Sequence, residues 1–509
     1  MQTAIEHFPV LIVAISLFSA ITILVAGWIN KKTPPFISIA TILAQFVASI
    51  LILNHVLTKG PIHYWLGGWK PPWGIEYVVD VLNAYVLVIL LFLGLACAVY
   101  SKRSIEHELP HKIVSFYAIY QLLITGLCGV TVTGDIFNMY VFIEIMSLSA
   151  YALIGSRGKI ALKASFTYLV LGSIGACFFL LGIGFLYSVT GSLNMHDLSL
   201  LLPPLYGNRI VKAAFVLFIV GLSIKMAFFP LHTWLPDAHA FAPSEISAML
   251  SGIIIEVCTY AFIRLAFSVF SVNFIRLLPI FDILCWVAGI AIIMGSILAM
   301  TQFNLKRMLA YSSVANMGYI MLAVGLSTSA RNYPWCGLTP ALMHILNHAL
   351  MKGCLFLVAG AFIYKADLWD ITELRGLGRK MPYTCAAFVI AAISMIGVPP
   401  SVGFVSKLYI IFASLEAKKF AFVAILLVSS LLNLIYFWRV IETMYMKGEE
   451  GEEHSHASIS SKDEIPLSML IPVLTLASLC IVMGVLWLAG ITIPALNKVN
   501  AMFGLVVIR

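Results

Sequence analysis

Charged residues are scarce in this sequence. Asp, Glu, Lys and Arg together make up 11% of its 509 residues, whereas a soluble globular domain has roughly 25%. Hydrophobic residues make up 61%, and runs of about 20 apolar residues recur from end to end, each long enough to cross a bilayer as a helix. This composition excludes a soluble protein and predicts an all-α polytopic membrane protein.

Motifs for cofactor chemistry are also missing. The nine cysteines are scattered, mostly inside apolar runs, with no C-x-x-C pair and no spacing suited to zinc or an iron–sulfur cluster. There is no Walker A phosphate-binding loop, no G-x-G-x-x-G after a strand and no haem-attachment motif. We therefore expect no metal and no cofactor in this chain. Any work that it does must be driven by an ion gradient or by a partner protein.

The apolar runs predict about fourteen transmembrane helices. Their approximate spans are 8–29, 36–57, 78–100, 112–130, 135–155, 162–188, 210–235, 243–268, 277–300, 307–328, 339–364, 383–415, 418–446 and 466–490. The first span follows MQTAIEHF, which has no Lys or Arg and no small-residue cleavage site, so we expect a retained helix and not a cleaved signal peptide. The whole chain, 1–509, is predicted to be a single integral membrane domain.

Positive charges in the loops predict the orientation. If each loop takes the number of the helix that it follows, the odd loops hold about sixteen Lys and Arg and the even loops about eight, which places the odd loops in the cytoplasm and both termini outside the cell membrane. This bias accounts for the net charge of +8 without any nucleic-acid partner. The longest polar insert, 447–464, is predicted to be a solvated loop, which we favour over metal binding by His454 and His456.

Two predicted helices carry interruptions of the same kind. In the seventh, Pro230 follows Lys225, and in the twelfth, Pro399 and Pro400 precede Lys407. Proline removes a backbone donor and displaces the carbonyl four residues back, and such breaks at membrane depth must face protein or water. Paired interruptions in two halves of a chain are typical of inverted-repeat transporters. The predicted divisions are helices 1–3 in 1–111, repeat one (helices 4–8) in 112–268, repeat two (helices 9–13) in 277–446, and a loop with helix 14 in 447–509.

Several ionisable side chains lie within the predicted spans. A charged residue at the centre of a membrane helix costs about 2.5–3.5 kcal/mol on insertion scales, and such residues mark functional paths by default. Three of them follow one another at four-residue intervals in the eleventh span, which places them on one slowly turning stripe of the helix. The candidate proton pathway consists of Glu144, Lys225, Glu256, His344, His348, Lys352 and Lys407.

These groups suit proton transfer. Burial disfavours the charged form of Lys and Glu and a nearby opposite charge favours it, so each group can change protonation with its partner or its hydration, and histidine titrates near neutral pH. We expect a water-linked relay, with the carbonyls freed at the two breaks holding water or a cation. A purely structural ion pair between Glu144 and Lys225 remains an alternative. Charged residues at helix ends are interpreted as interfacial anchors; they are Asp135, Lys163, Lys212, Lys306 and Arg307.

Five segments, in order along the chain, resemble one known family. They are TGDIFNMYVFIEIMSLSAYALIG, KMAFFPLHTWLPDAHAFAP, NLKRMLAYSSVANMGYI, HILNHALMKGCLFLVAG and GVPPSVGFVSK. They look like the antiporter-like subunits of respiratory complex I, of Mrp-type multisubunit cation/proton antiporters and of membrane-bound hydrogenases. The first segment is most similar to the Mrp D-type subunit and its hydrogenase counterpart.

The resemblance implies a fourteen-helix fold with inverted repeats, packed beside sister subunits. It implies roles in proton transfer for the glutamate of helix five, Glu144, the lysine of helix seven, Lys225, and the lysine of helix twelve, Lys407. It also implies such a role for a histidine of helix eleven, either of the two named above. Family members often have lysine in helix eight where this chain has Glu256, which reverses the charge at the expected junction of the two half-channels.

The leading hypothesis is a proton-translocating subunit of a multisubunit membrane complex, with exchange of H⁺ for Na⁺ left open. Its partners would be sister antiporter-like subunits, small membrane subunits and lipids. The complex would be an Mrp-type antiporter or a redox enzyme such as a membrane-bound hydrogenase or a complex I-like oxidoreductase. Two alternatives are a self-sufficient secondary transporter of a small ion and a non-conducting scaffold subunit.

Overall fold

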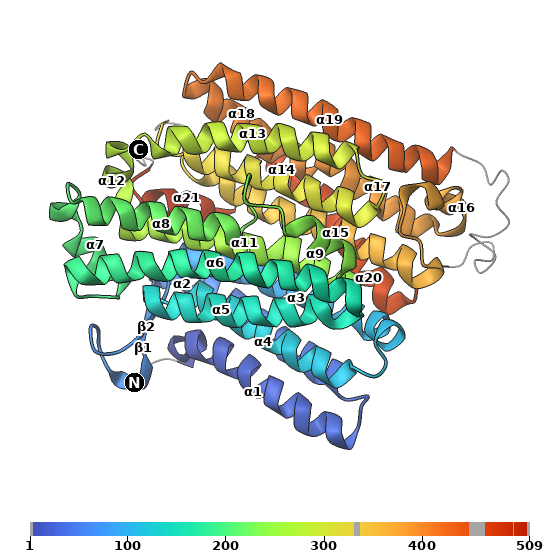
Figure 1. Ribbon diagram of the computed structural model, residues 1–509, viewed down its shortest axis with the longest axis horizontal. Coiled ribbons are helices and arrows are strands. Elements are labelled where there is room, and N and C mark those ends of the chain that lie inside the picture. The colour runs from blue at the N-terminus through green and yellow to red at the C-terminus, as the bar shows by residue number, and fades with distance from the viewer. Residues whose placement is uncertain (1–3, 330–335, 447–463, 492, 506–509) are drawn as a thin grey trace.

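The computed structural model describes residues 4–329, 336–446, 464–491 and 493–505, so His454 and His456 lie outside the described residues. Long helices run side by side along the long axis of the molecule (Figure 1). The first part of the chain forms α1 (Phe8–Ile29), α2 (Pro34–Lys59), β1 (Ile62–Trp65), β2 (Glu76–Val79), α3 (Val81–Glu108), α4 (Ile113–Val132), α5 (Ile136–Ile154), α6 (Lys159–Thr190) and α7 (Met195–Leu201). The middle forms α8 (Arg209–Lys225), α9 (Leu235–Phe241), α10 (Ser244–Met249), α11 (Ile255–Arg264), α12 (Ser271–Leu277), α13 (Ile280–Met300) and α14 (Leu305–Leu326). The last part forms α15 (Thr339–Ala366), α16 (Leu377–Lys380), α17 (Pro382–Ile396), α18 (Val402–Glu416), α19 (Phe420–Tyr445), α20 (Leu467–Leu488) and α21 (Pro494–Met502).

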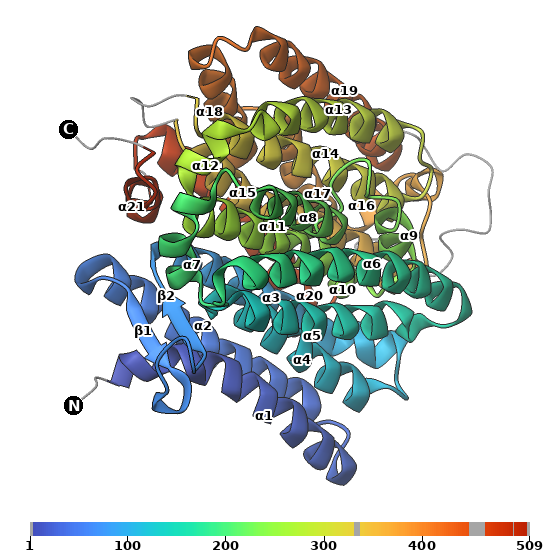
Figure 2. The same cartoon turned by 60° about the vertical axis from the view of Figure 1, so that its left-hand side comes forward.

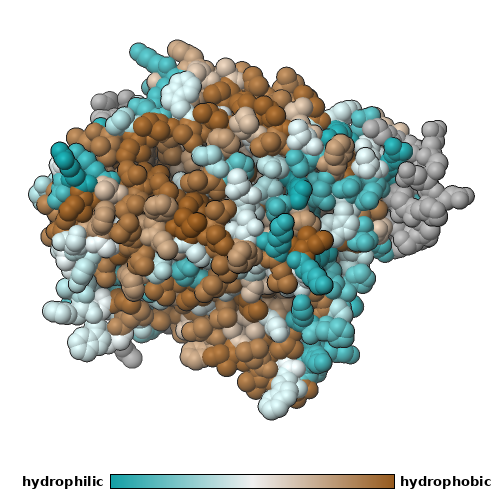
Figure 3. Space-filling view, in the orientation of Figure 1, coloured by the Kyte–Doolittle hydropathy of each residue, from teal (hydrophilic) through white to brown (hydrophobic). Residues whose placement is uncertain are grey.

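Twelve helical segments among the described residues are long and apolar enough to cross a membrane. The prediction of an all-α polytopic membrane protein is therefore confirmed. The two other predicted spans, 210–235 and 383–415, are those expected to be interrupted, and the structure divides each of them into helical parts. Apolar side chains cover much of the middle of the molecule, and hydrophilic ones gather toward the right-hand end in Figure 3. The total of fourteen spans and the inverted repeats stay predictions.

Polar caps begin some of the long helices. The Asp80 carboxylate accepts hydrogen bonds from the backbone N–H groups of Leu82 and Asn83, and the Asn83 side chain accepts one from the Asp80 N–H, so α3 begins with a reciprocal capping box. Asp135 caps α5 by accepting from the Asn138 N–H at 2.7 Å. The prediction that Asp135 is only an interfacial anchor therefore misses its role in starting the helix.

The two strands form a hairpin before α3. They pair antiparallel, with Ile62 opposite Val79, and the hairpin lies beside the N-terminal helices (Figure 2). His63 on β1 contacts the Glu76 carboxylate on β2 through Nδ1 at 2.8 Å. This contact joins the two strands, and the same carboxylate accepts a hydrogen bond from the Asn194 side chain at 3.1 Å, which ties the hairpin to the helix bundle.

The first predicted break begins at Lys225, where α8 ends. Ala227 then adopts a left-handed backbone conformation with φ of 52°, and irregular turns lead to α9. The indole N–H of Trp234 donates to the carbonyl of Ile224 at 2.9 Å and so satisfies one of the last carbonyls of α8. Proline displaces the carbonyl four residues before it, which for Pro230 is that of Met226. α8 already ends one residue before Met226, at Lys225.

The second break separates α17 from α18. Gly397 follows α17 with φ of 93°, a left-handed conformation that glycine adopts without strain. The chain turns and resumes as α18 at Val402. Both predicted interruptions are therefore present, each beside a buried lysine.

The most deeply buried helices surround the centre of the molecule. In the span Ser244–Val269, which contains α10 and α11, every residue of the most apolar stretch is buried, and α14 and α15 are buried along nearly their whole length. Two π-helical turns, Leu250–Ile254 and Leu265–Val269, interrupt this span. Such turns occur often at functional sites because they shift the direction of the side chains that follow.

Candidate functional site

The first pair of predicted residues lies where α8 ends against α5. The Lys225 ammonium donates to the Glu144 carboxylate and to the Ser147 hydroxyl, each at 2.8 Å. Lys225 is 2% exposed, whereas the Glu144 side chain is 24% exposed. The positive charge also sits at the C-terminal end of α8, where the helix dipole favours a cation. The structure therefore forms the ion pair that the sequence suggested, with its acid at the surface of the chain and its base inside.

The second pair joins α11 to α15. Glu256 follows the first π-helical turn, and its carboxylate lies 2.5 Å from Nδ1 of His348. Both side chains are buried. The second carboxylate oxygen of Glu256 and Nε2 of His348 have no hydrogen-bond partner within the described part of the chain. Either group can hold the proton of this contact, and the two unpaired atoms are further places where a proton can bind or leave.

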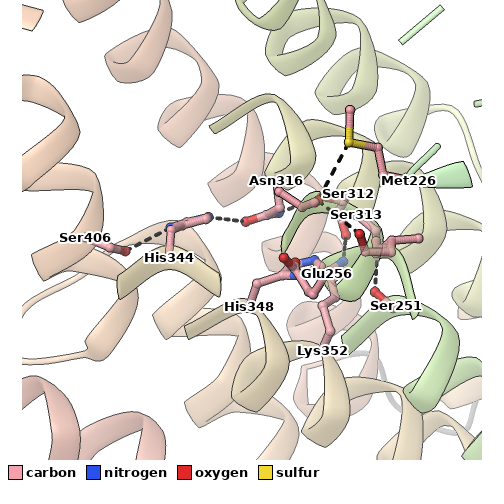
Figure 4. A network of polar contacts seen from close by, with 12 residues as sticks. Met226, Ser251, Glu256, Ser312, Ser313, Asn316, His344, His348, Lys352 and Ser406 are labelled. Atoms are coloured by element: carbon pink, nitrogen blue, oxygen red, sulfur yellow. Dashed lines mark hydrogen bonds and ion pairs between the residues drawn. The ribbon is translucent and has the colours of Figure 1, made fainter. Parts of the chain in front are cut away.

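A chain of hydrogen bonds extends from Lys352 along α14 (Figure 4). The Lys352 ammonium donates to the Ser312 hydroxyl and, at 2.7 Å, to the Leu309 carbonyl. The Asn316 amide donates to the Ser312 carbonyl at 2.6 Å, and its oxygen lies 3.0 Å from Nε2 of His344. These contacts connect Lys352 and His344, both on α15, to neighbouring polar groups of α14.

His344 then connects this chain to α18. Its Nδ1 lies 2.9 Å from the Ser406 hydroxyl, and the ring is fully buried. His344 and His348 share one face of α15, as predicted, but they have different partners. His348 pairs with an acid, and His344 bridges an amide and a hydroxyl.

Lys407 lies next to Ser406 and caps the second break. Its ammonium donates to the carbonyls of Met395 and Ile396 at 2.7 and 3.1 Å, and it lies 4.8 Å from the centre of the Tyr319 ring. At this break, two carbonyls at the end of α17 therefore bind the lysine of the same chain; that freed carbonyls hold water or a cation stays a prediction.

The Glu144–Lys225 and Glu256–His348 pairs approach each other where the end of α8 meets α11. Met226, which follows Lys225, accepts a weak hydrogen bond from the Thr259 hydroxyl at 3.7 Å, and Thr259 lies three residues after Glu256. The described residues form no direct hydrogen bond between Lys225 and Glu256. The structure thus brings the predicted groups into neighbouring clusters and not into one unbroken chain.

Several buried ionisable groups were missed or misinterpreted in the sequence. The sequence predicts an interfacial anchor at Lys306. Its side chain is instead 1% exposed, and its ammonium donates to the Ala242 carbonyl at 2.6 Å, so this prediction is wrong. Glu245 is fully buried at the beginning of α10. Arg264, at the end of α11, forms a 2.6 Å ion pair with Asp80. All three lie at ends of apolar runs, where sequence position alone does not distinguish a buried group from a solvated one.

No group of three or more His, Cys, Asp or Glu side chains in the described ranges is arranged to hold a metal ion. What the structure contains instead is a membrane-embedded set of acids, bases and hydroxyls linked by hydrogen bonds. These features define a polytopic helical protein with an ionisable interior, the class to which ion-translocating membrane subunits belong.

The chain belongs to the NADH:quinone oxidoreductase/Mrp antiporter transmembrane family, whose model matches residues 133–433. It is 42% identical over 488 residues to NADH-quinone oxidoreductase subunit N of Desulforudis audaxviator, covering 94% of this chain and 95% of that protein. It is 32% identical over 449 residues to the D-type subunit of the Na(+)/H(+) antiporter of Bacillus subtilis, covering 88% of each. The family prediction is thus confirmed, and the likeness extends beyond D-type subunits.

Solved structures agree with this assignment. A chain of the archaeal membrane-bound sulfane sulfur reductase matches with a TM-score of 0.87 and 31% identity, covering 97% of both chains. A chain of the Mrp complex from Dietzia sp. DQ12-45-1b matches with a TM-score of 0.86 at 24% identity, covering 99% of both. At 24% identity, the match to the Mrp chain shows a shared fold and no more.

Proposed function

We propose that this chain is a proton-translocating subunit of a multisubunit complex in the cell membrane. The observation that carries the proposal is the buried Glu256–His348 pair, in which a carboxyl oxygen and an imidazole nitrogen lie 2.5 Å apart and each group retains an atom without a partner among the described residues. A fold that needed only rigidity would fill these positions with apolar side chains, since a buried ion pair is weak support for stability. The family membership and the multisubunit complexes among its structural neighbours support the same function.

The proposed path uses the seven predicted residues. Lys225 contacts Glu144, and separation of that pair changes the electrostatic potential at Glu256, which lies on the neighbouring helix. The proton of the Glu256–His348 contact can then move toward Lys352. From there the hydroxyl and amide groups of α14 lead to His344 and, beside Ser406, to Lys407. The list of pathway residues is Glu144, Lys225, Glu256, His344, His348, Lys352 and Lys407.

We further propose that both termini lie outside the cell and that the odd loops face the cytoplasm, as their positive charge predicts. The partners are sister antiporter-like subunits and small membrane subunits, and this chain needs no cofactor of its own. Any redox chemistry would belong to a partner.

The test is reconstitution into sealed vesicles of the intact complex and of the chain alone, with H⁺ and Na⁺ movement measured separately. We expect H⁺ movement by the complex and none by the chain alone. Transport by the isolated chain would favour the self-sufficient transporter. A Na⁺ flux opposite to the H⁺ flux would identify the exchanged ion.

A further inference from the structure

A pocket opens at the end of the bundle where α3 and α15 both finish. Its volume is about 590 Å³, and its lining includes exposed His107 and Asp367 together with the Glu108–Arg157 ion pair at 3.1 Å. The side chains of Glu108 and Arg157 are only 7% and 16% exposed, so the ion pair forms the inner wall of the pocket. The pocket lies among connections that follow odd-numbered predicted spans, which is the side expected to face the cytoplasm.

A buried acid lies directly behind this wall. Ser104 precedes Glu108 by one turn of α3 and so lies on the same face of the helix, one step deeper. Its hydroxyl donates to one carboxylate oxygen of Glu245 at 3.2 Å. Glu245 is fully buried, and its other carboxylate oxygen has no hydrogen-bond partner in the part of the chain that the structure describes.

Two cations surround the segment that carries this acid. Arg157 and Lys306 both donate to the carbonyl of Ala242, at 3.3 and 2.6 Å. Ala242 lies three residues before Glu245. Arg157 of the pocket wall and the buried Lys306 therefore meet at a backbone carbonyl close to the acid in sequence. A buried acid with an unpaired oxygen, placed between an aqueous pocket and a buried lysine, can accept a proton from water and release it inward.

A second buried ionisable group that contacts the helix of Glu245 is His239. It is fully buried, and neither ring nitrogen has a hydrogen-bond partner among the described residues. Its backbone carbonyl accepts from the Ser247 hydroxyl at 3.1 Å, which ties it to the helix that carries Glu245. The ring stacks on Phe356 with the two centroids 4.5 Å apart, and the Lys352 ammonium lies 6.0 Å from the centre of that same Phe356 ring. His239 therefore lies between the acid behind the pocket and the lysine of the central network.

We propose that Glu245 is a further proton-carrying residue, which takes protons from the pocket beside Glu108 and Arg157 and passes them by way of His239 to Lys352. In the first step an O–H bond of a hydronium ion in the pocket breaks, an O–H bond forms on the unpaired oxygen of Glu245, and water is left. In the second step that bond breaks and an N–H bond forms on His239. In the third step this N–H bond breaks and the proton binds Lys352, which must first have passed its own proton on toward His344 and become a neutral amine, so no electrons are exchanged. This inference rests on the proposed function and adds an access route from the predicted cytoplasmic side.

The experiment compares Glu245→Gln and Glu106→Gln in the intact complex, reconstituted in sealed vesicles with H⁺ movement followed by a pH-sensitive dye. Gln has nearly the same shape as Glu but carries no exchangeable acid proton. Glu106 lies on the same helix as Glu108, but its side chain is 34% exposed and pairs with Arg103 one turn away. The H⁺ movement compared is the part that Lys225→Ala removes. We expect Glu245→Gln to lower this part at least tenfold, Glu245→Asp to restore some of it, and Glu106→Gln to leave it unchanged.

Normal H⁺ movement with Glu245→Gln, where Lys225→Ala lowers the movement to the background of the sister subunits, would overturn the access route and leave the proposed function standing. Normal movement in both variants would overturn the proposed function. If Glu245→Gln does not assemble, Ser104→Ala removes only the hydroxyl that binds the acid. A rate lowered several-fold supports the route, and an unchanged rate overturns it.

Discussion

Replacing Glu256 by Gln separates a structural role for this acid from a role in proton transfer. The carboxyl group contacts His348 at 2.5 Å inside the most deeply buried span. Gln has nearly the same volume and can still hydrogen-bond to the imidazole. What the substitution removes is the acid proton and the negative charge.

The expected magnitudes differ between stability and transport. Exchanging a hydrogen bond of an acid for one of a neutral amide should lower the free energy of unfolding by roughly 1 kcal/mol. Proton transfer by a positioned side chain contributes about 10²–10⁴-fold to a rate, so the H⁺ flux carried by this chain should fall at least about 100-fold. A small loss of stability together with a large loss of flux is the signature of a proton carrier.

The assay measures thermal unfolding of the purified complex and H⁺ movement in vesicles on the same preparations. Flux carried by this chain is the difference between the wild-type complex and the Lys225→Ala complex, since sister subunits contribute a background. Glu416→Gln, an exposed position at the end of α18, is the matched control. If Glu256→Gln retained the wild-type flux, Glu256 would not belong to the path.

Three further predictions follow from other contacts. Lys407→Met leaves the two carbonyls at the end of α17 without a donor, so we expect a loss of about 1–3 kcal/mol in thermal unfolding measurements, together with reduced H⁺ flux. Asp80→Asn leaves the buried Arg264 guanidinium without its counter-charge and should cost about 3–5 kcal/mol, seen as poor assembly of the complex, whereas a normal melting temperature would contradict it. The hydrogen bond to Glu76 raises the pKa of His63; its stabilising effect is therefore fully present below the ordinary pKa of histidine and lost as the pH rises through the raised pKa. Limited proteolysis of the hairpin should accelerate over that range, and His63→Gln should remove the pH dependence.

Much of the architecture was predictable because membrane spans have a strong signal. Uninterrupted apolar length identifies a span, and proline or glycine beside a buried lysine identifies a break, as at Pro230 and at Gly397. The partnership of Glu144 with Lys225 could also be anticipated, because two opposite charges at membrane depth need each other. These inferences depend on local composition alone.

The finer site could not be predicted, because its parts are ordinary residues. Hydroxyl and amide side chains such as Ser312, Asn316 and Ser406 occur throughout membrane helices, where they often bond to their own backbone. Only the packing of α14 against α15 and α18 shows that these three side chains contact Lys352 and His344. Lys306 was misinterpreted for a related reason, since a charge at the end of an apolar run lies equally well in solvent or under a neighbouring loop.

The most direct test of the central claim is ion flux through the intact complex carrying Lys225→Ala. The control is Lys212→Ala, at the opposite end of the same helix, where the side chain is partly exposed. Movement of H⁺ and of Na⁺ should be recorded separately in the same vesicles. We expect the complex to assemble and its total H⁺ movement to fall to the background carried by the sister subunits, while the control variant transports as much H⁺ as the wild-type complex. Undiminished H⁺ movement with alanine at position 225 would mean that the buried charges only hold the subunit in place.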